Sequence, residues 1–110
     1  MQQVTDASYE AILENKKVIL YLTLSYCHFC EKLKPFIEEL AKKNPDITFG
    51  ECILNNGHLI KLKRGNAIPF YVPAVLMFKK GRCVLTLESG CERPVRIGKI
   101  IQAINKEMKP

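Results

Sequence analysis

Residues 18–30 read VILYLTLSYCHFC, an apolar run that ends in two cysteines three positions apart. The run Val18–Leu24 is continuous and β-prone, which is typical of a central strand buried on both faces of a sheet. Apolar residues with helical spacing follow over residues 29–43. The sequence therefore predicts that Cys27 and Cys30 lie where a buried strand passes into a helix.

The position of these two cysteines has a definite chemical use. Residues three apart lie on one face of a helix, so the two sulfurs can meet within one turn. At a helix N-terminus, unpaired N–H groups and the helix dipole favour a thiolate, which is the nucleophile of disulfide exchange. We therefore expect Cys27 to attack a substrate disulfide and Cys30 to resolve the mixed disulfide. The spacing also occurs in zinc sites, but the strand-to-helix context favours a redox dithiol.

The rest of the chain alternates between strand and helix patterns. We expect a first helix that is capped by Thr5 or Asp6 and ends near Glu14. The other predicted elements are strands over Ile47–Leu54, Ala74–Phe78 and Cys83–Glu88, a turn at 55–57, a helix from His58 to Arg64, and a last helix that Pro94 opens, with the apolar stripe Ile97, Ile100, Ile101 and Ile104. This order predicts one α/β domain over residues 1–110. Its mixed four-stranded sheet is flanked by helices, and Val4 is the candidate for a short fifth edge strand.

Composition and charge limit the partners that we expect. The net charge of +6 is spread over many sites without an aromatic-rich basic motif, so we expect a solvated surface and no nucleic-acid partner. The N-terminus has no basic patch followed by an apolar run, and Val18–Leu24 is too short to span a bilayer. We expect a cytoplasmic monomer without a membrane partner.

The chain holds five cysteines, an odd and scattered set. Cys52 lies in an apolar strand and is expected in the core. A bridge between Cys83 and Cys91 would require the chain to bend back at Ser89-Gly90, and the sequence leaves the state of both residues open. A second Cys-x-x-Cys is missing, so we expect no metal site and no cofactor beyond the dithiol.

Three segments together resemble the thioredoxin superfamily over nearly the whole chain. They are the strand that leads to Cys27-His-Phe-Cys30, Pro35 at the place of the proline that kinks the active-site helix, and the stretch VPAVLMFKKG over residues 72–81. The resemblance implies a thioredoxin-like α/β fold. It also implies that Pro73 is cis and lies beside Cys27, and that the backbone of Val72 binds the substrate peptide.

The chain departs from thioredoxins around the cysteines. Tyr26 occupies the position of a tryptophan, and His28 and Phe29 replace Gly-Pro. A protonated His28 would favour the Cys27 thiolate, but a helix N-terminus disfavours that charge, and the alternative is an exposed residue that only modulates substrate fit. We expect Tyr26, His28 and Phe29 to modulate the active site.

A second departure concerns the proton acceptor. The resemblance implies a buried Asp six residues before the first cysteine, and Tyr21 stands there instead. We hypothesise that Glu51 lies beneath the dithiol and takes the proton from Cys30. The alternative is an exposed Glu51, because a shift of one residue in the strand turns its side chain to the other face.

Taken together, these features predict an enzyme, a thioredoxin-like protein-disulfide oxidoreductase. It would reduce or exchange disulfides of proteins or small molecules, with electrons from a reductase or glutathione. Reduction is the direction expected in the cytoplasm. The alternative is a non-catalytic thioredoxin-like module that holds a partner and uses the dithiol as a redox sensor. The sequence leaves the substrate, the reductase and the direction open.

Overall fold

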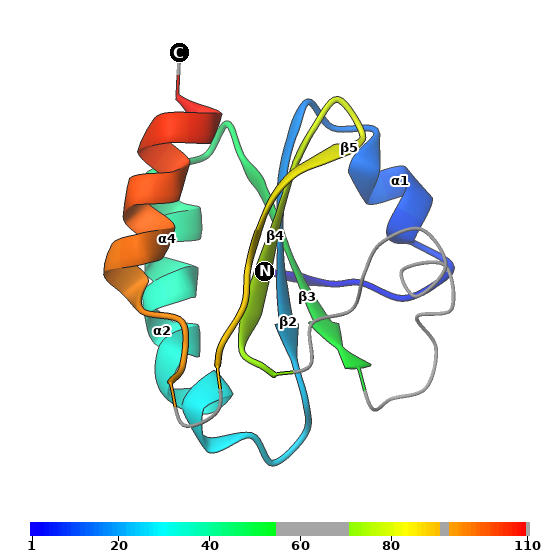
Figure 1. Cartoon of the computed structure of the whole chain (residues 1–110). Coiled ribbons are helices and arrows are strands. Elements are labelled where there is room, and N and C mark those ends of the chain that lie inside the picture. Colours follow the sequence, from blue (N-terminus) through cyan, green and yellow to red (C-terminus); the bar gives the residue numbers. More distant parts are fainter. Residues whose placement is uncertain (55–70, 91–92, 110) are drawn as a thin grey trace.

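The computed structural model describes residues 1–54, 71–90 and 93–109. Its strands form one sheet in the order β1-β3-β2-β4-β5 (Figure 1). The strands are β1 (Gln2–Gln3), β2 (Lys17–Thr23), β3 (Thr48–Ile53), β4 (Ala74–Lys79) and β5 (Arg82–Leu87). The helices are α1 (Tyr9–Leu13), α2 (His28–Lys43) and α4 (Ile97–Ala103), which continues as the π-helical segment η2 (Ile104–Met108). None of these helices is both long enough and apolar enough to cross a membrane, as far as the described residues go.

Strand directions bring three chain segments to one edge of the sheet. β1, β3 and β2 are parallel, whereas β4 is antiparallel to both β2 and β5. The ends of β2 and β3 therefore lie at the same edge as the start of β4 (Figure 1). The loop from β2 into α2 leaves from this edge.

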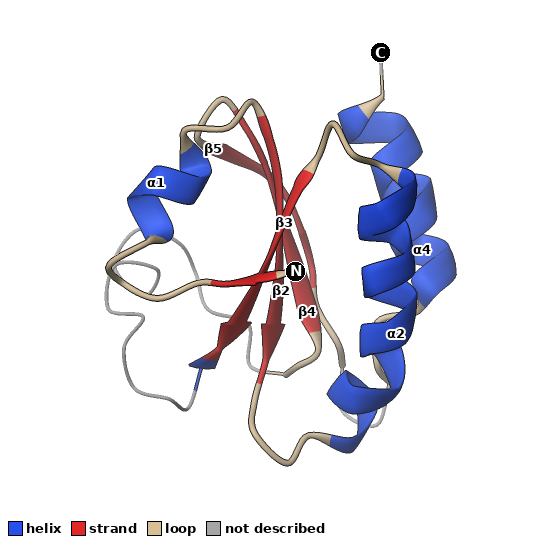
Figure 2. Cartoon of the chain, turned by 180° about the vertical axis from the view of Figure 1, so that it is seen from behind, coloured by secondary structure: helices blue, strands red, loops and turns tan. Residues whose placement is uncertain are grey.

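Helices cover both faces of the sheet, with α2 and α4 on one face and α1 on the other (Figures 1 and 2). Alternate residues of a strand point to opposite faces, so β2 and β4 contribute to two separate cores. The core under α2 and α4 includes the strand residues Ile19, Tyr21, Phe49, Val75 and Met77. The core on the α1 side includes Val18, Leu20, Leu22, Cys52 and Leu76. The prediction of central strands buried on both faces is thus confirmed.

The fifth edge strand is present, although it is only two residues long and ends just before Val4, the residue predicted to belong to it. β1 pairs in parallel with β3, and the Val4 N–H then donates to the Glu51 carbonyl at 2.8 Å. The Val4 side chain is buried against Tyr9 and Ile12 of α1. Burial of Val4 therefore anchors the N-terminal segment to the sheet.

The structure corrects the predicted start of the first helix. α1 begins at Tyr9 with Ser8 as its N-cap residue, not with Thr5 or Asp6. The Thr5 N–H donates to Ser8 Oγ at 3.0 Å, and the Thr5 carbonyl accepts from the Tyr9 N–H. These bonds close a turn over the residues that were expected to be helical, so the helix starts later.

The last helix also starts later than predicted. α4 begins at Ile97 after the N-cap residue Arg96, so Pro94 precedes the helix and does not open it. Ile101 is 42% exposed and does not belong to the buried stripe. The stripe is centred on Ile100 and Ile104, and successive helical residues point about 100° apart, which turns Ile101 outward. The predicted turn at 55–57 and helix at 58–64 lie outside the described residues.

Candidate active site

Cys27 and Cys30 form a disulfide at the start of α2, with their Cα atoms 5.2 Å apart. Cys27 is the N-cap residue of the helix, and its Sγ accepts a hydrogen bond from the Cys30 N–H at 3.2 Å. Cys27 is half-buried, whereas Cys30 is buried, at 3% exposure. A substrate can therefore reach Cys27 from solvent, and the Cys30 N–H favours negative charge on Cys27 Sγ.

The residues around Cys27 form an exposed aromatic rim. Tyr26 is fully exposed, and its backbone lies in the left-handed region with φ of 63°. His28 and Phe29 are exposed on the first turn of α2, with ring centroids 5.8 Å apart. These three side chains are therefore accessible from solvent.

The Val72–Pro73 peptide bond is cis, with Pro73 buried and Val72 half-buried. Ala74 pairs with Leu22 of the antiparallel strand β2, so Pro73 lies just before β4 at the edge where β2 ends. The structure therefore brings this segment to the end of the sheet from which the chain continues to Cys27.

Ser89 ties the cis-proline segment to the chain that precedes α4. Its hydroxyl donates to the Pro73 carbonyl and accepts a hydrogen bond from the Val95 N–H at 2.9 Å. Ser89 is 5% exposed. Sequence reasoning missed this contact, because a single serine after a strand carries no distinguishing pattern.

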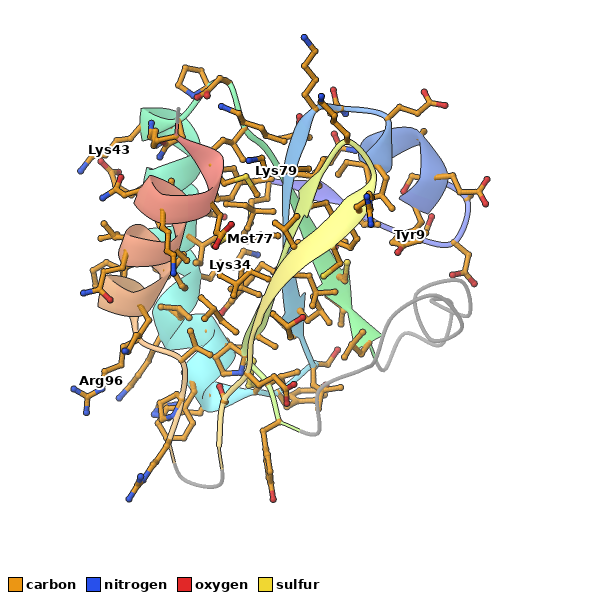
Figure 3. All side chains as sticks on the ribbon, turned by 45° about the horizontal axis from the view of Figure 1, so that its top comes forward. Tyr9, Lys34, Lys43, Met77, Lys79 and Arg96 are labelled. Carbon is orange, nitrogen blue, oxygen red and sulfur yellow. A yellow bond between two sulfur atoms is a disulfide. The ribbon has the colours of Figure 1, made fainter. Side chains whose placement is uncertain are left out.

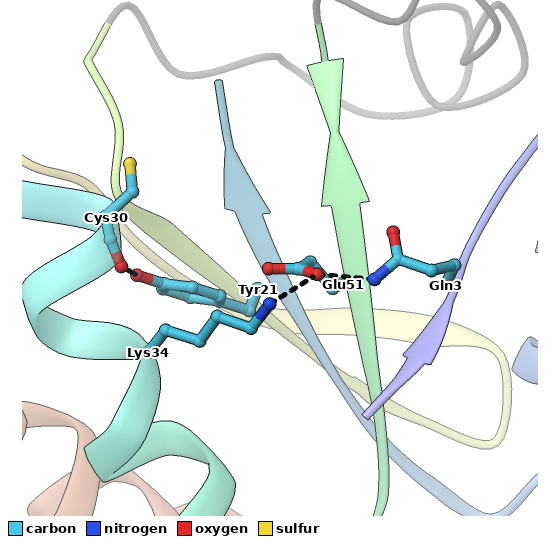
Figure 4. Close-up of polar contacts among 5 residues, drawn as sticks. All are labelled: Gln3, Tyr21, Cys30, Lys34 and Glu51. Carbon is cyan, nitrogen blue, oxygen red and sulfur yellow. Dashed lines mark hydrogen bonds and ion pairs between the residues drawn. The ribbon is translucent and has the colours of Figure 1, made fainter. Parts of the chain in front are cut away.

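Glu51 is buried, at 4% exposure, on the face of the sheet that α2 covers. Its carboxylate forms an ion pair with Lys34 Nζ of α2 at 3.3 Å and accepts a hydrogen bond from Gln3 Nε2 (Figure 4). Glu51, Lys34 and Cys30 line one cavity of about 160 Å³. The structure thus places Glu51 at the cavity that Cys30 also lines, and the alternative of an exposed Glu51 is wrong.

Tyr21 occupies the strand position opposite Glu51 in the β2–β3 register. Its hydroxyl donates to the Cys30 carbonyl at 2.6 Å (Figure 4). Burial, and then the negative charge of Glu51, raise the pKa of Tyr21 well above its usual range. Tyr21 is therefore a neutral donor that anchors the first turn of α2, not a proton acceptor.

Lys34 and Gln3 are the partners that sequence reasoning missed. Lys34 lies four residues after Cys30 in the same helix, and this spacing puts it on the same helix face. That spacing was an available signal for Lys34. Gln3 offered none, because a two-residue strand is too short to show a pattern.

The other cysteines have different environments. Cys52 is a free thiol in the core, as predicted, and burial followed by the charge of Glu51 raises its pKa to about 12. Cys83 is a free, exposed thiol on β5, and Cys91 lies outside the described residues. No group of three or more metal-ligating side chains occurs within residues 1–54, 71–90 and 93–109.

Comparison with known proteins adds one family and a set of similar folds. The family model described as Thioredoxin matches residues 1–105. No curated protein matches the sequence.

Three solved structures illustrate the likeness of fold. Thioredoxin f2 of Chlamydomonas reinhardtii superposes with a TM-score of 0.85 at 18% identity, covering 100% of this chain and 98% of that chain. Plasmodium falciparum thioredoxin gives 0.81 at 23% identity, covering 97% and 99%. A complex of ferredoxin:thioredoxin reductase and thioredoxin f2 gives 0.82 at 18% identity, covering 97% and 94%. At these identities the likeness is one of fold.

Proposed function

Because the chain belongs to the thioredoxin family, we propose that it reduces disulfide bonds of protein substrates, with Cys27 attacking and Cys30 resolving. Thiol–disulfide oxidoreductase activity follows from the family and from the Cys27–Cys30 pair. The roles of the individual residues and the direction of the reaction are the proposal.

The observation that carries the proposal is the difference in burial between the two cysteines. Cys27 is half-buried at a helix N-terminus, where N–H groups favour a thiolate, whereas Cys30 is almost fully buried one turn further on. A protein disulfide can approach the first sulfur but not the second. This arrangement supports an attacking thiol followed by an internal resolving thiol.

The proposed reaction transfers two electrons and two protons to the substrate. The Cys27 thiolate attacks one sulfur of the substrate disulfide and forms a mixed disulfide, and the other substrate sulfur leaves and takes up a proton. Cys30 then loses its proton and attacks Cys27 Sγ, which breaks the mixed disulfide and releases the second substrate thiol. The Cys27–Cys30 disulfide that remains is the state of the structure.

Glu51 is the proposed proton acceptor for Cys30. Its carboxylate lines the same cavity as Cys30, and Lys34 and Gln3 hold it there. The neighbouring Tyr21 cannot take this role, because its hydroxyl is already donated to the Cys30 carbonyl and its pKa is raised. Glu51 is therefore the carboxylate best situated for the transfer.

The proposed peptide-binding edge consists of Val72 and Pro73, with Tyr26, His28 and Phe29 as modulators of fit. Val72 is half-buried, which leaves part of it available to a substrate, and the three rim side chains are exposed. His28 is exposed next to Cys27, which favours the role of a contact residue.

A reductase is the electron donor that we propose for regenerating the dithiol. Support comes from the similar fold of thioredoxin f2 in its complex with ferredoxin:thioredoxin reductase. Glutathione is the alternative donor. A reducing compartment, the cytoplasm, fits the exposed free thiol of Cys83, which would be prone to oxidation elsewhere. Detection of the protein only in secreted or organellar fractions would contradict this part.

Insulin reduction tests the proposal. With dithiothreitol as the electron source, the wild-type protein should accelerate insulin reduction, which is followed as turbidity. Cys27→Ser should be inactive, because it lacks the attacking sulfur, and Cys30→Ser should accumulate a mixed disulfide that mass spectrometry detects. A wild-type rate no greater than that of dithiothreitol alone would contradict the proposal and favour a binding module.

A further inference from the structure

An apolar groove is lined by residues of α2 and of the chain that enters α4. Its volume is about 350 Å³, and its apolar lining consists of Phe29, Leu33, Phe36, Pro94, Val95 and Ile97. Phe29 is 44% exposed and Phe36 is 55% exposed. We call this feature the α2–α4 groove.

The groove begins at the dithiol. Phe29 lies between the two cysteines in the sequence, and Leu33 and Phe36 follow it along α2. On the other side, Val95 is hydrogen-bonded to Ser89, which also holds the Pro73 carbonyl. A polypeptide whose disulfide reaches Cys27 can therefore extend into the groove.

The rim of the groove is basic. Lys32 and Arg96 line it, and no acidic side chain does so among the described residues. Neither cation forms an ion pair within the described part of the chain. An adjoining hollow contains Arg96 and Lys99 together with one acid, Glu88. Figure 3 shows Arg96 projecting outward at the start of α4.

We propose that the α2–α4 groove binds an apolar side chain of a protein substrate that carries acidic residues beside it. This inference rests on the proposed function, since the occupant is a segment next to the disulfide under attack. The apolar floor matches an aliphatic or aromatic side chain, and the two rim cations, which have no ion-pair partner among the described residues, match carboxylates. Opposite charges across such a rim speed association and make it depend on salt.

Two disulfide peptides test the inference. Each peptide has one internal disulfide. In the acidic peptide a cysteine of this disulfide is followed by Leu-Asp-Glu, and in the basic peptide by Ser-Lys-Lys. We expect a higher kcat/KM for the acidic peptide, with the preference decreasing as salt rises to about 0.5 M. Phe36→Ser and Arg96→Glu should each lower the ratio of kcat/KM for the acidic peptide to that for the neutral 2-hydroxyethyl disulfide, by about fivefold.

Matched controls lie on the same helices outside the groove. Ile101→Ser removes an exposed apolar side chain of α4, and Lys43→Glu reverses a charge at the far end of α2 (Figure 3). Both should keep the wild-type ratio. Equal ratios in Phe36→Ser, Arg96→Glu and wild type, with the neutral disulfide still reduced, would overturn the inference and leave the proposed function standing.

Self-association is the other outcome that would overturn the inference. Sedimentation equilibrium that shows a dimer in the wild type and a monomer in Phe36→Ser would assign the groove to a second copy of the chain. If the protein reduces neither peptide and also fails to reduce the neutral disulfide, the proposed function itself is contradicted.

Discussion

Side chains from three parts of the chain surround the buried carboxylate of Glu51. Its partners are Lys34 from α2 and Gln3 from β1, and its neighbour across the β2–β3 pair is Tyr21. A buried carboxylate is costly unless it is paired and hydrogen-bonded, so these contacts are what keep it in the interior. The same contacts hold it in the cavity that Cys30 lines.

Replacement of Glu51 by Gln should slow the resolving step. The amide keeps the shape of the side chain but cannot accept the Cys30 proton, and we expect a decrease of about tenfold to a hundredfold at pH 7. Stopped-flow kinetics of mixed-disulfide resolution between pH 6 and 9 would measure it. Glu39→Gln is the matched control, since Glu39 is exposed on α2 and should behave as wild type. Unchanged kinetics in Glu51→Gln would rule out the proposed role.

Cys52 should make the folded state less stable at alkaline pH. Its pKa is about 12 in the fold against an ordinary 9.0, so between these values the unfolded chain loses a proton that the folded chain retains. The contribution of Cys52 to the free energy of unfolding is unchanged below pH 9.0 and declines above it, by at most about 1.4 kcal/mol per pH unit. Urea unfolding of the oxidised protein should show a shallower decline in Cys52→Ala. Parallel pH profiles in the two proteins would contradict the raised pKa.

At the residue scale, sequence reasoning predicted those side chains whose role depends on local spacing. The positions of Cys27 and Cys30 follow from a strand pattern that is followed, after a short loop, by a helix pattern. The sequence could not decide on which face of the sheet Glu51 lies, because the length of the preceding loop leaves the register open by one residue. Ser89 acts through a tertiary contact with Pro73, which no local pattern encodes.

At the element scale, the apolar runs predicted the long strands, whereas the short elements followed from packing. The prediction for β2 is off by one residue at each end, and α2 starts one residue earlier than expected. β1 is stabilised by Val4 in the core and by pairing with β3, neither of which its own two residues reveal. The start of α1 depends on a turn closed by Ser8, a contact that competes with helix formation.

Gly50 allows Val4 and Ile12 of α1 to pack closely against β3. A Cβ atom at this position would lie 2.5 Å from Val4 Cγ2 and 2.8 Å from Ile12 Cδ1. Gly50→Ala should therefore destabilise the protein by about 1–3 kcal/mol in urea unfolding.

Gly98 of α4 provides the control for Gly50, because a Cβ there would meet nothing within 4 Å. Gly98→Ala should stabilise the protein by about 0.5–1 kcal/mol, since alanine favours the helix. A Gly50→Ala variant as stable as Gly98→Ala would show that the packing at β3 is looser than described.

At the scale of the whole molecule, the order of strands creates the site. The parallel strands β2 and β3 end at the edge where the antiparallel strand β4 begins, so the dithiol, Glu51 and Pro73 are brought to one end of the sheet. For Pro73 the resemblance to thioredoxins implied a place beside Cys27, and for Glu51 the sequence supported only a hypothesis. The position of the α2–α4 groove could not be predicted, since it depends on how α4 packs beside α2.

The reduction potential of the Cys27–Cys30 couple tests the central claim most directly. Equilibration of the protein with dithiothreitol or glutathione redox buffers, followed by alkylation and mass spectrometry, measures it. If this protein reduces protein disulfides, its potential should be about −270 mV. A potential of about −120 mV would identify a strong oxidant and contradict the proposed direction of the reaction.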